Sequence, residues 1–122
     1  MKIKKIPAVF EEKETDVTRS KDGVLVFEIE KNNEYSIAYG ELAVGEKNKK
    51  HKLEMQELYY IIQGIGKIIV ESREEVIKKG ALIIIPENTT QQIQNTGQEK
   101  LKFLMIVNPP FDSEKEEIYE DK

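Results

Sequence analysis

Short β-rich segments separated by turn residues dominate the chain between residues 23 and 107. The segments are rich in Val, Ile, Leu, Tyr and Phe, and Gly, Asn, Pro or Ser stand between most of them. This rhythm is typical of antiparallel sandwiches and barrels. No helical apolar stripe appears before residue 111, so we expect an all-β fold. The expected strands are 23–29, 35–44, 51–53, 58–63, 67–71, 75–78, 82–85, 92–94 and 101–107.

A chain of 122 residues has the length of one domain. We predict an N-terminal arm over residues 1–22, with an edge strand near 5–10, and a barrel over 23–111. Residues 112–122 form an acidic tail. Ser113 and Glu116 have the spacing of a capping box, so this tail is expected as either a short helix or a frayed end.

Composition excludes several classes of protein. The net charge is −4, with 19 basic and 23 acidic residues finely interspersed, which argues against a nucleic-acid partner. The mean hydropathy of −0.55 and the lack of a long apolar window argue against a membrane partner. There are no cysteines, and the N-terminus lacks the apolar core of a signal peptide, so we expect a cytoplasmic protein. The abundance of Lys, Glu and Ile is common in thermophile proteins and in chains from A+T-rich genomes.

Two segments carry the residues that could do chemistry. The first contains the only histidine of the chain, in the pattern Gly45, five residues, His51-x-Leu53, three residues, Glu57, six residues, Gly64.

The second segment follows after fifteen residues. Its pattern is Gly80, five residues, Pro86-x-Asn88, two residues, Gln91, three residues, Asn95.

Alternate residues of a barrel strand face its interior. Gln91 therefore shares a face with Ile93, and Glu57 shares a face with Tyr59. We expect the spacing to direct His51, Glu57 and Gln91 at one point, as a metal site or an acid–base site requires. The apolar lining is expected to comprise Leu53, Ile61, Ile93, Phe103 and Met105.

Together the two segments resemble the paired motifs of the cupin superfamily, whose members are small jelly-roll barrels. All the spacers fit at once, over about half of the chain. The resemblance implies a double-stranded β-helix and a metal centre built from three His and one Glu. Leu53 and Gln91 stand at two of the histidine positions. The site therefore resembles a cupin metal centre that lacks two of its usual ligands. The remaining ligand set would be His51, Glu57 and, through its amide oxygen, Gln91.

The resemblance implies three functions. In the first, a divalent ion (Zn, Mn, Fe or Ni) on His51, Glu57 and Gln91 acts on a small oxygen-bearing metabolite such as a sugar or an oxo-acid. In the second, a metal-free isomerase or epimerase uses His51 as base, oriented by Glu57, and Tyr59 as acid. In the third, the barrel binds or senses a small ligand without turnover. The residues leave open whether the protein is an enzyme.

The resemblance also implies a homodimer, since small cupins commonly pack one sheet against a partner. Apolar side chains expected on the outer face would suit such an interface. These are Ile62, Ile69, Leu104 and Ile106.

Overall fold

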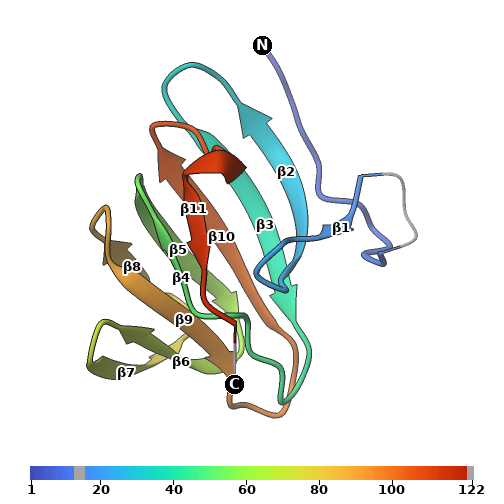
Figure 1. The fold of residues 1–122 in the computed structure, drawn as a ribbon. Helices are drawn as coiled ribbons and strands as arrows, with labels where there is room; N and C mark the ends of the chain where they lie inside the picture. The colour runs from blue at the N-terminus through green and yellow to red at the C-terminus, as the bar shows by residue number, and fades with distance from the viewer. Residues whose placement is uncertain (13–15, 121–122) are drawn as a thin grey trace.

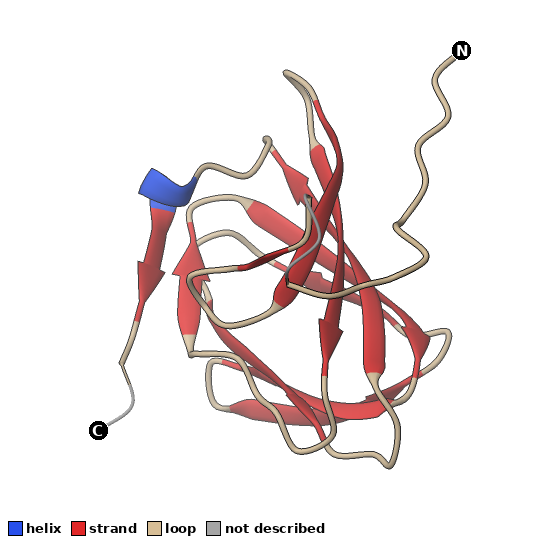
Figure 2. Cartoon of the chain, turned by 90° about the vertical axis from the view of Figure 1, so that its right-hand side faces the viewer, coloured by secondary structure: helices blue, strands red, loops and turns tan. Residues whose placement is uncertain are grey.

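The computed structural model describes residues 1–12 and 16–120, and this part of the chain is almost entirely β-structure (Figures 1 and 2). Its strands are β1 (Thr18–Arg19), β2 (Leu25–Lys31), β3 (Ser36–Leu42), β4 (His51–Leu53), β5 (Gln56–Gln63), β6 (Ile65–Val70), β7 (Arg73–Lys78), β8 (Leu82–Ile85), β9 (Thr90–Asn95), β10 (Leu101–Asn108) and β11 (Glu116–Ile118).

The strands form two antiparallel sheets that face each other. Sheet A has the order β1-β2-β3-β10-β5-β8, and sheet B has the order β11-β4-β9-β6-β7. Neighbouring strands in each sheet are often distant in the chain, as in β3-β10-β5 and β4-β9-β6. This is the connectivity of a jelly roll, and the predicted all-β barrel is confirmed.

The core lies between the sheets because the strands alternate buried and exposed side chains. On β5, Glu57, Tyr59 and Ile61 are buried, whereas Tyr60 between them is 42% exposed. On the neighbouring strand of sheet A, Phe103 of β10 packs edge-on against Tyr59 with ring centroids 5.5 Å apart. Complete burial of such a side chain stabilises the fold by about 1.5–3 kcal/mol.

The N-terminal edge strand lies later in the chain than predicted. Residues 5–10 form no strand, and Pro7 among them has no N–H to donate to a ladder. Phe10 instead packs edge-on against Tyr39 on the outer face of sheet A, with ring centroids 4.9 Å apart. The edge strand is β1, which pairs with β2. Residues 13–15 of the predicted arm lie outside the described residues.

The C-terminal segment forms one helical turn and then a strand. A 3-10 turn spans Ser113–Lys115, and its N-cap is Asp112, whose Oδ1 accepts a hydrogen bond from the Glu114 N–H at 3.0 Å. The chain then pairs with β4 as β11, so the predicted helix ends after a single turn. Figure 2 shows the turn and the strand that follows it. The hydrogen bonds offered by the edge of β4 outweigh the local helical signal.

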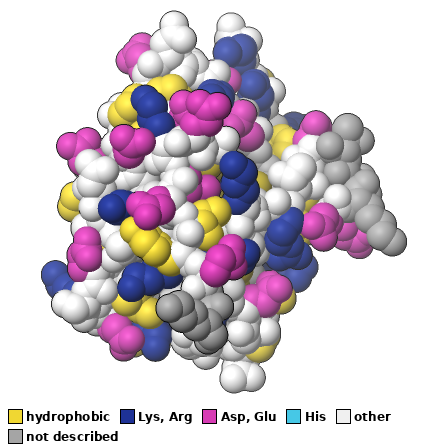
Figure 3. Space-filling model, in the orientation of Figure 1, with side chains coloured by type: hydrophobic (Ala, Val, Ile, Leu, Met, Phe, Trp, Pro, Cys, Tyr) yellow, Lys and Arg dark blue, Asp and Glu magenta, His cyan; other side chains and the backbone are white. Residues whose placement is uncertain are grey.

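The surface is mixed in charge. On the face shown in Figure 3, acidic and basic side chains alternate, and no histidine is visible. Among the described residues, no helix has the length and apolar character needed to cross a bilayer.

Two neighbouring residues of β7 test the alternation. Ile77 is 5% exposed and Val76 is 76% exposed. We expect Ile77→Ala to lower the free energy of unfolding by about 2–5 kcal/mol, because it removes buried methyl groups and leaves a cavity. The matched change Val76→Ala should cost less than about 1 kcal/mol. Urea denaturation measures both, and equal losses would show that β7 does not bury one face.

Candidate functional site

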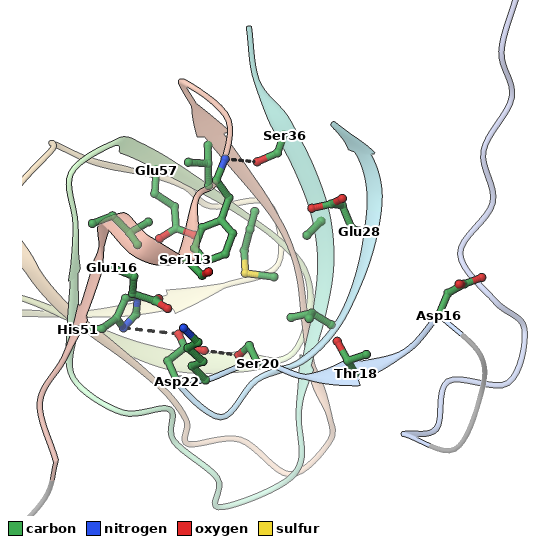
Figure 4. A pocket seen from close by; sticks show the side chains of 17 residues that line it. Asp16, Thr18, Ser20, Asp22, Glu28, Ser36, His51, Glu57, Ser113 and Glu116 are labelled. Atoms are coloured by element: carbon green, nitrogen blue, oxygen red, sulfur yellow. Dashed lines mark hydrogen bonds and ion pairs between the residues drawn. The ribbon is translucent and has the colours of Figure 1, made fainter. Parts of the chain in front are cut away.

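A cavity of about 310 Å³ lies over the inner face of sheet A (Figure 4). Its volume is at the lower end of the range for small-molecule sites. The turn before β2 and the segment that leads into β11 form its other walls. The apolar part of its lining comprises Val26, Ala38, Leu53, Met105, Val107 and Phe111.

His51 stands on the wall formed by β4, and only 2% of its surface is exposed. Its Nδ1 lies 2.9 Å from the carbonyl oxygen of Lys49. A carbonyl only accepts hydrogen bonds, so Nδ1 is the donor in this contact and Nε2 is the ring nitrogen that remains for a ligand. No described residue forms a hydrogen bond with Nε2. The ring is therefore oriented by the backbone and keeps one nitrogen available for a ligand.

Asp22 approaches His51 from the turn between β1 and β2. This turn closes with a hydrogen bond from the Gly23 N–H to the Ser20 carbonyl, and Gly23 has a φ of +102°, which only glycine adopts without strain. The Asp22 carboxylate accepts hydrogen bonds from the Ser20 hydroxyl and, at 3.1 Å, from the Asn48 amide. Its Oδ2 lies 3.5 Å from Nδ1 of His51.

Glu116 approaches His51 from β11. It is the cross-strand partner of Leu53, so it points to the same side of sheet B as Leu53 and His51. One ligand atom each from Asp22, His51 and Glu116 lie within 4.8 Å of one another. Figure 4 shows the three side chains converging on one end of the cavity.

This cluster fits a divalent metal ion. An imidazole with two carboxylates is a donor set that Zn, Mn and Fe accept, with positions left for water or a ligand. Burial, and after it the nearby Asp22 carboxylate, raise the pKa of Glu116 to about 7, against the lowering effect of Lys21. A bound cation would favour the ionised form of this carboxyl.

A chain of buried hydrogen bonds lies beside the cluster. Gln91 of β9 is the cross-strand partner of His51. Its Nε2 donates to Oε1 of Glu57 at 3.0 Å, and its Oε1 accepts from the Tyr59 hydroxyl at 3.0 Å. Both ends of the Gln91 amide therefore have protein partners, and the bond to Glu57 joins sheet B to sheet A.

Glu57 holds a proton at neutral pH. Burial, and after it the Asp22 carboxylate, raise its pKa to about 8, and the hydrogen bond from Gln91 opposes this rise. Because Oε1 accepts from Gln91, the proton belongs on Oε2. Burial likewise raises the pKa of Tyr59 well above its usual range, so its hydroxyl stays protonated.

The structure brings the four residues singled out in the sequence into one buried region. His51 and Glu57 line the cavity, whereas Gln91 and Tyr59 do not. Sequence reasoning missed Asp22 and Glu116. Asp22 stands in an Asp-Gly pair, which is typical of a turn, and Glu116 stands in a capping-box pattern; both patterns indicate local structure and no ligand.

The expected apolar lining divides between two places. Leu53 and Met105 border the cavity. The other three residues, Ile61, Ile93 and Phe103, belong to the core cluster.

Comparison with known proteins identifies the family. The cupin-domain profile matches residues 38–107, which is more than half of the chain. The chain belongs to the cupin family. The cupin is also 36% identical over 107 residues to the uncharacterized protein MJ1618 of Methanocaldococcus jannaschii, a match that covers 83% of this chain and 86% of the relative.

Solved structures show the same fold at low sequence identity. A predicted oxalate decarboxylase from Thermotoga maritima superposes with a TM-score of 0.70 at 23% identity, covering 83% of this cupin and 98% of that chain. KdgF from a Halomonas species gives a TM-score of 0.72 at 14% identity, over 89% and 99% of the two chains. The nucleoside dehydratase Pac13 gives 0.73 at 17% identity, over 85% of each chain. These likenesses concern the fold alone.

The raised pKa of Glu57 predicts a stability that falls with pH. Between its ordinary value of 4.5 and about 8, the folded state keeps a proton that the unfolded state releases. The free energy of unfolding in EDTA should therefore fall by a few kcal/mol, on the order expected for such a shift, as the pH rises from about 5 to about 8. Glu57→Gln should flatten this slope, because glutamine does not ionise.

Thermal and urea denaturation across this pH range provide the measurement. Glu117→Gln is the matched control, because Glu117 is an exposed residue of β11. The control should keep the slope of the parent protein. A Glu57→Gln variant with an unchanged slope would contradict the assignment of a buried, protonated carboxyl.

Proposed function

We propose that this cupin holds a divalent metal ion between Asp22, His51 and Glu116 and uses the cavity to bind, and act on, a small oxygen-bearing metabolite. The observation that carries the proposal is the approach of these three groups to within 4.8 Å on the wall of the cavity. One of them is the only histidine of the chain, and it is buried with one ring nitrogen available.

Each group around the cavity has a distinct task in this proposal. A divalent ion supplies a Lewis acid that polarises an oxygen of the ligand. Lys49 fixes the orientation of the His51 ring through its carbonyl, and Ser20 and Asn48 fix the Asp22 carboxylate. Glu57 presents its protonated oxygen to the bound metabolite as a hydrogen-bond or proton donor.

Two sets of metal ligands can be compared: Asp22, His51 and Glu116, or His51, Glu57 and Gln91. The hydrogen bonds of Gln91 favour the first set. The Gln91 amide oxygen already accepts from Tyr59, and Glu57 is neutral at pH 7, so both are poor metal ligands. Gln91 instead positions Glu57. Asp22 and Glu116 take the places that the family pattern gives to other residues.

The metal-free alternative finds less support in the geometry. It requires the Tyr59 hydroxyl to reach the ligand, but Tyr59 is 1% exposed, does not border the cavity and donates to Gln91. The names of the structural neighbours include a predicted decarboxylase and a dehydratase, so they favour no single reaction.

Metal binding tests the proposal. We expect the purified protein, after dialysis against EDTA, to take up one equivalent of Mn²⁺ or Zn²⁺ in isothermal titration calorimetry. Asp22→Asn and Glu116→Gln should each weaken binding by about 10-fold or more, because each replaces a charged ligand by a neutral amide. His51→Ala should abolish it.

Glu117→Gln is the control for Glu116→Gln, since it removes the same charge from the outer side of the same strand. It should leave the affinity unchanged. Equal weakening in both variants, or full affinity after His51→Ala, would place the ion elsewhere and end the proposal.

We also propose that the outer face of sheet A binds a second copy of the chain. Cross-strand partners on this face form two apolar rows over β10, β5 and β8. We call these side chains the outer patch: Leu58, Tyr60, Leu82, Ile84, Leu104 and Ile106. Three are well exposed, at 42% for Tyr60, 56% for Leu82 and 59% for Ile84. Patches of this kind mark interaction surfaces, and β8 adds an unpaired sheet edge.

Two members of the predicted apolar surface, Leu104 and Ile106, belong to the outer patch. A third, Ile62, lies on the same face of sheet A, two residues after Tyr60 on β5. The fourth, Ile69, lies on β6 and therefore belongs to sheet B.

Light scattering coupled to size exclusion tests the dimer. We expect a mass of twice the 14.1-kDa chain for the parent protein and a shift to the single-chain mass for Ile84→Glu, because a charge would be buried at the interface. Val76→Glu, which places the same charge on exposed β7, should stay dimeric. A parent protein that elutes as one chain would exclude this interface.

A further inference from the structure

The floor of the cavity has acids at both ends and apolar side chains between them. Strand pairing places Glu28 of β2, Ala38 of β3, Met105 of β10 and Tyr59 of β5 in one row across the inner face of sheet A. Glu57 stands two residues before Tyr59 on β5. Because neighbouring strands lie about 4.8 Å apart, the backbone of Glu28 is about 14 Å from the β5 end of the row.

The two ends differ in what their acids can bind. Asp22 and Glu116 converge on His51 at one end. Figure 4 shows Glu28 and Asp16 at the opposite end, on the side of the N-terminal segment. Among residues 1–12 and 16–120, neither Glu28 nor Asp16 has an ion-pair partner, and both line the cavity.

Among the described residues, Lys21 is the one lysine on the cavity wall, and it acts on Glu116, whose pKa it lowers. The Glu28 end therefore presents carboxylates beside an apolar floor, with no lysine or arginine among the described residues that line it. A carboxylate only accepts hydrogen bonds, and it attracts a protonated amine while repelling an anion.

The structure assigns the ligand to the small aliphatic amino alcohols, bound with the oxygen toward Asp22, His51 and Glu116 and the ammonium group toward Glu28. This inference deepens the proposed function and rests on it for the oxygen end. The buried His51 ring, with no partner on Nε2 among the described residues, is the independent sign that a ligand atom belongs at that end. Ala38 and Met105 would contact the methylene chain.

The charge of the far end of the cavity favours amino alcohols over the other small oxygen-bearing metabolites, sugars and oxo-acids. An ammonium group gains both charge attraction and hydrogen bonds from the carboxylate at the far end of the cavity, whereas a sugar hydroxyl gains a hydrogen bond alone and the anionic group of an oxo-acid is repelled. The length of the floor requires a linear molecule whose amine and hydroxyl lie at opposite ends, and the cavity volume of about 310 Å³ accommodates such a molecule.

Three probes with the same six-carbon body test the assignment by calorimetry: the terminal aminohexanol, hexanediol and hydroxyhexanoate. We expect aminohexanol to bind about three- to fivefold tighter than hexanediol in Mn²⁺-loaded protein at low salt, as an exposed ion pair allows. In metal-free protein, where no ion can take its carboxylate, hydroxyhexanoate should bind weakest. The preference for the amine should shrink at high salt, because Glu28 is exposed.

Glu28→Gln should make aminohexanol and hexanediol bind alike, while Mn²⁺ binding stays as in the parent protein. Glu75→Gln on exposed β7 removes the same charge outside the cavity and should keep the amine preference. The assignment is overturned if hydroxyhexanoate binds metal-free protein as tightly as aminohexanol, if no probe binds, or if Glu28→Gln keeps the preference.

The metal site and the amine assignment can be tested independently of each other. Mn²⁺ titration without any probe reports the metal site alone, and Asp22→Asn should weaken Mn²⁺ binding by about 10-fold or more without removing the preference for the amine. Repeating the probe series in EDTA then measures the Glu28 end by itself. A parent protein that binds no Mn²⁺ but keeps a Glu28-dependent preference for the amine would refute the metal proposal and support the amine assignment.

Discussion

The hydrogen bond from Gln91 to Glu57 is the contact on which the geometry of the site depends. It joins the inner faces of the two sheets at 3.0 Å in a region where both side chains are buried. Because Gln91 is also the cross-strand partner of His51, the same residue sets the distance between the imidazole wall and the carboxyl wall. An unpaired amide or carboxyl here would cost about 1–3 kcal/mol, so the pairing also fixes one arrangement of the barrel interior.

Electrostatics then divide the site into two parts. Burial keeps the Glu57 carboxyl protonated, so it can donate but is poorly suited to bind a cation. Asp22 and Glu116 supply the negative charge instead, and they come from the two ends of the chain. The loss of two family histidines at Leu53 and Gln91 is therefore accompanied by carboxylates from outside the family motifs. This arrangement explains why a cupin with one histidine can still present a metal-compatible cluster.

The sequence contained enough to predict the barrel and the inward residues of its motifs. Alternating burial is a local property of a strand, so the inward faces of Glu57 and Gln91 follow from spacing alone. The positions of Asp22 and Glu116 do not follow in this way. Each depends on how an end of the chain packs against a distant strand, and periodicity carries no information about such contacts.

The C-terminal segment illustrates the same limit. Ser113 and Glu116 have the local pattern of a helix start, and the chain does make one helical turn there. The following residues then pair with the edge of β4 as strand β11. This pairing directs Glu116 toward His51. Tertiary hydrogen bonds thus overrode a local preference, as is common for short segments. The functional assignment of Glu116 depends on that outcome.

Anomalous diffraction from crystals soaked in Mn²⁺ would test the central claim most directly. The account predicts one strong anomalous peak inside the cavity, within coordination distance of the Asp22 and Glu116 carboxylates and a ring nitrogen of His51. A peak bound by Glu57 and Gln91 instead, or peaks only on the outer surface, would contradict it.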